Sequence, residues 1–460
     1  MPPLGRFARD PTPVALPFDE VPHVPGHLAQ QQAHRHVGQS ESEDDRGRHR
    51  DENNRPGSYR SHTFINSKRA AVLTAENDDN RRWNFLQVTD YIDMPAIAAA
   101  LREPLRRALI GERAEWPPLS DDDVRTLVEH GVAPLVYAVA HVPELRDDAM
   151  TAAAIEPLRL DDLREVLAAL DARGVKALLM KGSALAYDVF ASPDLRPRSD
   201  TDLLVDPAAY AAAREAMLSL GFREQLTSGD EHGVRQQVFV RTDRFGVAHV
   251  YDVHWAIANS PLFADVVRIG EIDALPLPRI GEHAFALPHV EALLLACVHR
   301  VAHHHDSERL LWLCDIDLLR ARMSDDEHAR FWRRAADRRV LAVCARSIAL
   351  AEESLGREPS HRAERYLSER ELAQREASRR FLDRRITYAG VTLANLRALP
   401  WSARLRRLRQ LAFPPAAFMR QSFPTRSRAA LPWLYVYRGA RGFARLFRRV
   451  GEITGTTNRR

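Results

Sequence analysis

Hydrophobic and polar positions change their spacing twice along the chain. From 94 to 173, apolar residues recur at helical intervals, as in LRLDDLREVLAALDARGV. Between 174 and 287, short apolar runs (VKALLM, TDLLV) are followed by alternating segments (RQQVFVRT, GVAHVYDVHW), which are typical of strands. From 288 to 400 the helical spacing returns, as in VEALLLACVHRVAHH. We therefore predict an α/β (α+β) core with a mixed sheet, flanked by N-terminal and C-terminal helical regions.

Capping residues mark where several of these elements begin and end. Ser120 precedes three acidic residues and predicts a helix N-cap, and Gly131 ends that helical pattern. Asp206, followed by a proline, predicts the start of another helix, which ends at Gly221. The middle region therefore has the predicted order strand–helix–strand–helix–strand–strand.

The two ends of the chain differ from the rest. Residues 1–60 are polar and charged, and we predict a disordered tail because they bury too little apolar surface to offset their ordering entropy. The histidines of this tail fit a solvated segment better than a metal-binding tract. Residues 61–93 form an uncertain linker. Residues 401–460 are rich in arginine and aromatic side chains, with no Asp or Glu from 401 to 450.

Composition narrows the class of protein. The chain has 460 residues, 45% of them hydrophobic, and a formal net charge of +4, which suits a globular protein of more than one domain. No apolar run approaches the ~20 residues needed to span a membrane, and the N-terminus lacks the apolar core of a signal peptide. We therefore predict a cytoplasmic protein. Cys297, Cys314 and Cys344 are widely spaced and predict buried free thiols.

Three carboxylates in the middle region are candidate metal ligands. Asp200 and Asp202 open the TDLLV strand, and residues two apart on a strand point to the same face. Asp252 interrupts a strand that is otherwise apolar at Val250 and Val253. Carboxylates placed together repel one another, and a hard divalent cation such as Mg²⁺ (or Mn²⁺) removes that cost.

Candidate phosphate-binding residues lie around the first two acids. Gly182 and Ser183 stand where a strand gives way to a helix, so free N–H groups face a ligand there, and Lys181 adds a positive charge. Arg196, Arg198 and Ser199 lie between this turn and Asp200; arginine forks suit phosphate oxygens. Each signal alone is more often a turn or a cap, but the ordered set favours a catalytic interpretation.

At these residues the sequence resembles the DNA polymerase beta-like nucleotidyltransferase superfamily, and most closely its uncharacterised bacterial branch. The resemblance rests on LLMKGSALAY, LRPRSDTDLLV and YDVHW. It implies that Gly182 and Ser183 hold nucleotide phosphates, that Asp200 and Asp202 bind metal, and that Asp252 helps to bind metal and to activate an acceptor hydroxyl. The spacing from Ser183 to Asp200 is longer than in compact members, and a threonine replaces the usual apolar residue between the first two acids.

The implied activity is transfer of NMP from an NTP, with ATP expected, to an unidentified acceptor hydroxyl or phosphate on a small molecule, a protein or an RNA, releasing pyrophosphate. Two alternatives stay open. One is a catalytically silent nucleotide-binding or regulatory module, and the other is an adenylyltransferase of polysaccharide or natural-product biosynthesis.

Two further features have competing interpretations. His299 and His303 have the spacing of zinc ligands on a helix, but Arg300 stands where a zinc protease needs glutamate, so a helix face near the active site or plain surface is favoured over zinc for the cluster that continues to His305. The tail beginning at 401 fits wrapping around the protein, peripheral contact with an anionic membrane, or nucleic-acid binding, and the resemblance favours wrapping.

Overall fold

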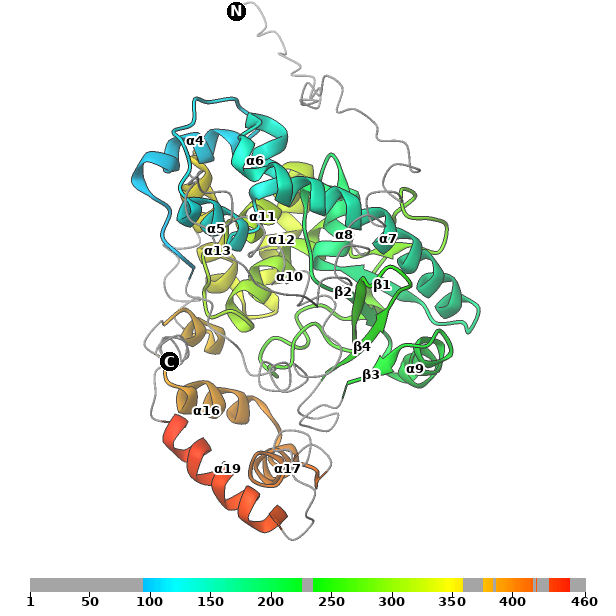
Figure 1. Ribbon diagram of the computed structural model, residues 1–460. Coiled ribbons are helices and arrows are strands. Elements are labelled where there is room, and N and C mark those ends of the chain that lie inside the picture. The colour runs from blue at the N-terminus through cyan, green and yellow to red at the C-terminus, as the bar shows by residue number, and fades with distance from the viewer. Residues whose placement is uncertain are drawn as a thin grey trace, which may run out of the picture. The chain divides into compact units, whose positions relative to one another are not determined.

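The computed structural model describes residues 94–225, 235–358, 375–383, 386–416, 419 and 430–446. The predicted tail (1–60) and linker (61–93) lie outside these residues. Helices and strands carry the labels of Figure 1.

Among the described residues, four α-helices precede the sheet, and local signals in the sequence explain where some of them begin and end. They are α4 (Ala99–Leu109), α5 (Asp121–Glu129), α6 (Ala133–Ala140) and α7 (Arg146–Asp171). Ser120 caps α5 in a reciprocal capping box with Asp123, as predicted, and this pairing satisfies two backbone N–H groups at the helix start. Gly131 takes a left-handed conformation (φ +76°) and ends the helical pattern.

Seven strands form one mixed sheet in the order β3-β4-β5-β2-β1-β7-β6. They are β1 (Ala177–Met180), β2 (Thr201–Val205), β3 (Arg223–Glu224), β4 (Gln236–Thr242), β5 (Ala248–His254), β6 (Leu275–Pro276) and β7 (Phe285–Ala286). The central strand β2 pairs antiparallel with β1 and parallel with β5. This arrangement brings strands from both ends of the middle region next to one another.

The remaining helices connect the strands or follow the sheet. They are α8 (Lys181–Asp188), α9 (Tyr210–Ser219), α10 (His289–Ala302), α11 (Leu310–Arg322), α12 (Asp325–Asp337), α13 (Leu341–Leu355), α16 (Tyr388–Ala398), α17 (Trp401–Ala412) and α19 (Leu431–Leu446). A short 3-10 turn, Pro207–Ala209, precedes α9, and the Asp206 side chain accepts a hydrogen bond from the Ala208 N–H, as its predicted capping role requires.

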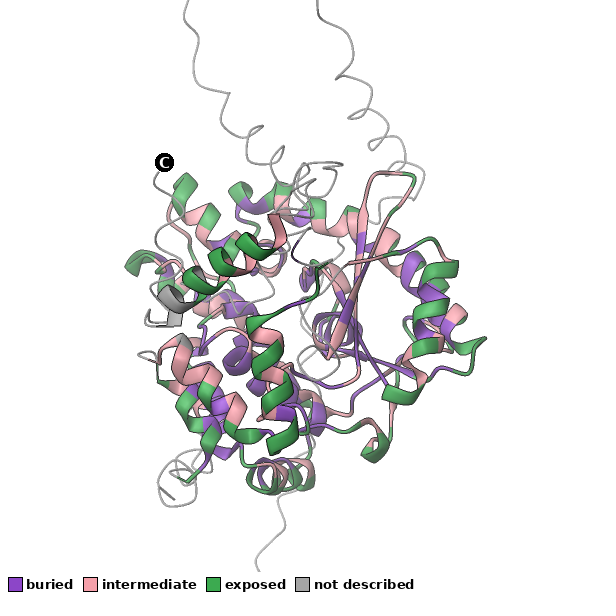
Figure 2. Cartoon of the chain, turned by 90° about the horizontal axis from the view of Figure 1, so that it is seen from below, coloured by how far each residue is buried: buried purple, intermediate pink, exposed green. Residues whose placement is uncertain are grey.

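The two faces of the sheet belong to two different cores. Side chains alternate along β1, so that Leu178 and Met180 join one cluster while Ala177 and Leu179 join the other. The first cluster contains residues of α4–α6 and of α10–α13, so the two helical regions share a core on one face. The second contains α7 and α9. Buried residues gather in the sheet and in the helices against it (Figure 2).

The predicted fold class is confirmed: the chain has a mixed seven-stranded sheet flanked by helices. The predicted boundaries at 174, 288 and 400 stay predictions. The three cysteines are free and buried, as expected. None of the described helices is both long and apolar enough to cross a membrane.

Candidate active site

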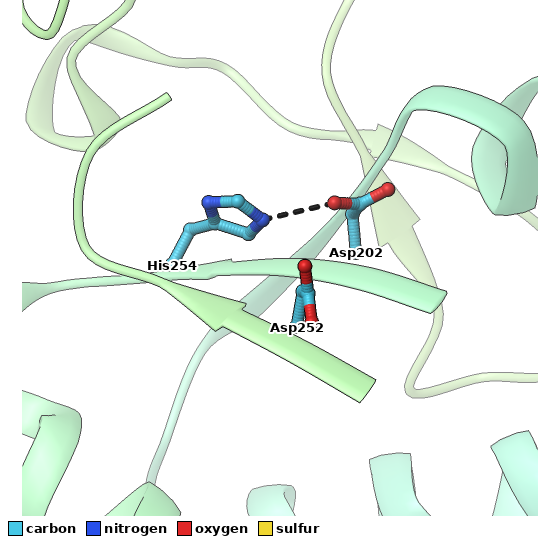
Figure 3. A group of neighbouring side chains, drawn as sticks. All are labelled: Asp202, Asp252 and His254. Carbon is cyan, nitrogen blue, oxygen red and sulfur yellow. Dashed lines mark hydrogen bonds and ion pairs between the residues drawn. The ribbon is translucent and has the colours of Figure 1, made fainter. Parts of the chain in front are cut away.

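Two of the predicted acids meet across adjacent strands. Asp202 on β2 and Asp252 on β5 are partners in the parallel register. Neighbouring strands lie about 4.8 Å apart, so partner side chains project side by side. His254 lies two residues after Asp252, on the same face of β5. The three side chains therefore converge (Figure 3).

These three residues have the donor set of a cation site. One ligand atom from each of Asp202, Asp252 and His254 lies within 4.8 Å of the other two, and the described residues contain no other such group of three or more His, Cys, Asp or Glu. Two carboxylates suit a divalent cation, and the imidazole adds a softer donor than the oxygen ligands that Mg²⁺ prefers. The residues thus fit a divalent metal, with a donor set that favours transition metals such as Mn²⁺ more than three carboxylates would.

Asp202 is the most heavily partnered acid of the site. Its Oδ1 accepts a hydrogen bond from Lys181 Nζ at 2.6 Å and lies 2.9 Å from His254 Nε2. Lys181 has a left-handed backbone (φ 51°), an unfavourable conformation for a residue with a side chain. The chain tolerates this cost at the end of β1, where it directs the ammonium group to the acid.

Burial and neighbouring charges shift the pKa values of Asp202 and Asp252 in opposite directions. Burial alone would raise the pKa of Asp202, but Lys181 and His254 hold it well below its usual range. Burial and then the negative charges of Asp200 and Asp202 raise the pKa of Asp252 well above its usual value. Burial would lower the pKa of Lys181, but the carboxylates, Asp202 first, raise it. Three carboxylates thus face one ammonium group, and a bound divalent cation would balance the excess negative charge.

Asp200 lies just before β2, outside the group of three. Burial and then the charge of Asp202 raise its pKa. Ser199 Oγ is 3.4 Å from Asp200 Oδ1, and Ser183 Oγ is 3.4 Å from the Asp200 carbonyl oxygen. The structure therefore places Asp200 beside the site, with its carboxylate held only by a long contact from an exposed serine.

Gly182 and Ser183 lie inside the first turn of α8, whereas we expected the helix to begin after them. Met180 takes the extended N-cap position, with no side-chain cap on the helix. A close contact within the protein favours glycine at position 182, because an added Cβ would lie 2.8 Å from Arg196 Nη1. Ser183 is almost fully buried. The uncapped N–H groups of this turn, rather than either side chain, are therefore the phosphate-binding candidates.

Arg196 and Arg198 are buried in ion pairs, which changes the role we assign to them. Arg196 donates to Asp315 on α11 through Nε (3.0 Å) and Nη2 (2.6 Å). Arg198 Nη1 donates to Glu156 on α7 at 2.7 Å, and Tyr187 donates to the same carboxylate at 2.7 Å. These pairs attach the loop before Asp200 to helices on either side and bury both guanidinium groups, although Nε and Nη2 of Arg198 have no hydrogen-bond partner among the described residues.

Arg159 is a candidate that we missed from the sequence. It lies three residues after Glu156 on α7, hence on the same face of that helix as the partner of Arg198. Burial, followed by the charge of Arg198, lowers the pKa of Arg159 to about 10, while Glu156 and Asp200 oppose the shift. No hydrogen bond or ion pair joins its guanidinium to another described residue. Only helix periodicity could have indicated it, and only once Glu156 was known to face the site.

The histidine cluster borders this site. His299 stacks on His303 (ring centroids 5.3 Å apart), and His304 packs on Trp312 at 4.3 Å. His299 and Trp312 also line a cavity with Lys181, between β1–α8 and α10–α11. Burial and then the charge of Lys181 lower the pKa of His299 well below its usual value, so its ring is neutral.

This arrangement matches the interpretation of the cluster as a helix face near the active site. Among the described residues, none of these histidines belongs to a group of three or more His, Cys, Asp or Glu whose ligand atoms lie close together. Arg300, at the position of the missing glutamate, pairs with Asp306 at 2.6 Å in the interior.

A mixed sheet that places paired acids on neighbouring strands, next to a strand-to-helix turn, is consistent with the core of a nucleotidyltransferase. Comparison with known proteins agrees. The model of a family described as uncharacterised nucleotidyltransferase matches residues 121–356, and the chain belongs to that family. No curated protein and no solved structure matches the chain.

Proposed function

We propose that the chain transfers NMP from an NTP to an acceptor hydroxyl or phosphate in a metal-dependent reaction. The observation that carries this proposal is the convergence of Asp202, Asp252 and His254 beside the uncapped start of α8. Mg²⁺ or Mn²⁺ is the expected metal, and ATP is the expected nucleotide. When bound, the metal supplies positive charge to the phosphate oxygens.

The remaining roles in the reaction belong to residues of the chain. The acceptor oxygen attacks the α-phosphorus, a new P–O bond forms, and the bond to the pyrophosphate oxygen breaks. Asp252, which is the register partner of Asp202 on the neighbouring strand, receives the acceptor proton in its carboxylate form. Gln236 donates to Asp252 Oδ2 at 2.9 Å and thereby fixes the orientation of that carboxylate.

Positive charge for the triphosphate comes from Lys181 and Arg159. Lys181 lies at the first turn of α8, where free N–H groups also point outward. Arg159 supplies a guanidinium with no hydrogen bond or ion pair to another described residue, whereas the side chains of Arg196 and Arg198 are buried beside Asp315 and Glu156. This assignment moves phosphate binding from the loop before Asp200 to helix α7.

Transfer of label tests the proposal. The full chain is incubated with each α-labelled NTP, Mg²⁺ or Mn²⁺ and cell extract, beside an Asp200→Ala/Asp202→Ala variant and the exposed control Asp265→Asn. We expect labelled product from the parent and the control only. The chemical class of the labelled product identifies the acceptor as a small molecule, a protein or an RNA.

The same experiment also tests the alternative of a nucleotide-binding module without catalysis. The Lys181–Asp202 pair already gives the acid a cation, so a nucleotide-binding module without catalysis would keep this pair permanently. Nucleotide binding by the parent, with no label transferred under any of these conditions, would establish that alternative.

Arg159 is tested separately. Arg159→Gln is expected to raise KM for the NTP by about tenfold, because one charge-assisted contact is worth roughly 1.5–3 kcal/mol. Arg146→Gln, at the exposed start of the same helix, is the matched control. An unchanged KM in Arg159→Gln would remove this residue from the proposed site.

A further inference from the structure

Helix α17 presents its apolar side to solvent. Trp401, Leu405 and Leu408 are spaced at i, i+4 and i+7, so they share one face, and they are 70%, 52% and 48% exposed. Ala403, on the opposite face, is buried. A helix that only covers a core has the reverse arrangement, with its apolar stripe inward.

Helix α19 repeats the pattern. Trp433, Val436 and Tyr437 share one face and are 76%, 64% and 53% exposed. Tyr435, on the other side, donates a hydrogen bond to the Pro414 carbonyl oxygen at 2.6 Å, which joins α19 to the segment after α17. In Figure 1 the two helices lie together with α16.

The exposed apolar residues of α17 and α19, together with Phe413 just after α17, are called the outward surface. Its members are Trp401, Leu405, Leu408, Phe413, Trp433, Val436 and Tyr437. Ten large hydrophobic side chains are exposed among the described residues, and seven of them belong to this surface. Single exposed apolar residues need no explanation, but such a concentration marks an interaction surface.

The positive charge of this part of the chain indicates which kind of partner the outward surface binds. Residues 401–450 contain no Asp or Glu and are rich in arginine. On α17, the exposed Arg409 lies beside the apolar stripe, whereas Arg404 on the other side donates to the carbonyl oxygens of Leu399 and Arg397. An apolar centre with tryptophans and basic edges matches the interface of an anionic bilayer, where the apolar face enters the headgroup boundary.

Other partners fit the outward surface less well. Nucleic acid would require arginines at the centre of the face to reach phosphates, but the centre is Trp, Leu and Val. A second copy of the chain would bring two arginine-rich rims together without acidic partners. We propose that the outward surface binds anionic lipid bilayers. This proposal does not depend on nucleotidyl transfer.

Vesicle sedimentation of the full chain tests the proposal. Vesicles contain phosphatidylcholine alone or mixed with phosphatidylglycerol. The parent is expected to sediment with the anionic vesicles, and less so as salt is raised. A Trp401→Ser/Leu405→Ser/Trp433→Ser variant is expected to lose affinity on the order of tenfold or more, since it loses most of the inserted apolar area. Its folding is checked by circular dichroism.

A matched control and two competing outcomes complete the test. Met150→Ser/Leu218→Ser removes exposed apolar residues elsewhere and should bind vesicles like the parent. Failure of the parent to bind anionic vesicles, or equal binding by the triple variant, overturns the proposal. So does RNA binding that survives the serine substitutions, or a dimer that they dissociate while vesicle binding is absent.

Discussion

The pair formed by Arg196 and Asp315 is expected to be essential to the fold around the site. Both side chains are almost fully buried, at 7% and 5% exposure, and two hydrogen bonds join them. Removing one partner of a buried pair typically costs about 3–5 kcal/mol, because the other charge is left uncompensated in the interior. We therefore expect Asp315→Leu to lower the free energy of unfolding by about that amount.

A control on the same helix separates burial from simple charge removal. Asp317 pairs with Arg357 at 2.8 Å, but the arginine is 44% exposed. Exposed pairs contribute about 0–1 kcal/mol, so Asp317→Leu should have a small effect. The assay is urea unfolding followed by circular dichroism. Equal losses in the two variants would refute the argument from burial.

Two double variants extend the same argument to the site. Arg196→Met/Asp315→Leu should recover most of the loss, since it leaves no unpaired charge. Gly182→Ala should cost about 1–3 kcal/mol in the parent, because Asp315 holds the Arg196 guanidinium against the new methyl group. In an Arg196→Met background the same substitution should cost less. If it costs the same, the glycine is required by something other than this contact.

Three further outcomes follow from single contacts. His254→Gln should weaken Mn²⁺ binding more than Mg²⁺ binding, measured by calorimetry, while Asp202→Asn should weaken both; equal effects on the two metals in His254→Gln would exclude the imidazole as a ligand. The hydrogen bond that His289 donates to the Asp188 carboxylate raises the pKa of His289 above 6.5, so the stability it supplies is complete below pH 6.5 and is lost as pH rises through the raised value; unfolding of parent and His289→Gln should differ at pH 5.5 and converge at pH 8.5. Ser120→Ala should cost about 1 kcal/mol in thermal unfolding, since it removes the N-cap of α5, and no change in Tm would contradict the capping role.

Local rules in the sequence predicted much of the fold. Asp202 and Asp252 could each be assigned to a strand because alternation of side chains is a property of the backbone, and Ser120 and Asp206 could be recognised as caps because capping is completed within three residues. Strand order is different, because it depends on which strands pair across long stretches of chain. The parallel pairing of β2 with β5, which brings the two acids together, was therefore not predictable from periodicity.

The roles of the arginines show why the rest of the site escaped prediction. Arg196 and Arg198 are residues of a type that is common in phosphate-binding loops, and no neighbouring residue in the sequence opposes that interpretation. Their partners are 119 and 42 residues away, at Asp315 and Glu156, so only the tertiary structure reveals these ion pairs. Because these contacts hold Arg196 and Arg198, Arg159 is the arginine to which we assign the proposed phosphate role. The role of a buried arginine depends on the carboxylate that lies nearest to it in space. For Arg196 and Arg198, those carboxylates belong to helices outside the sheet.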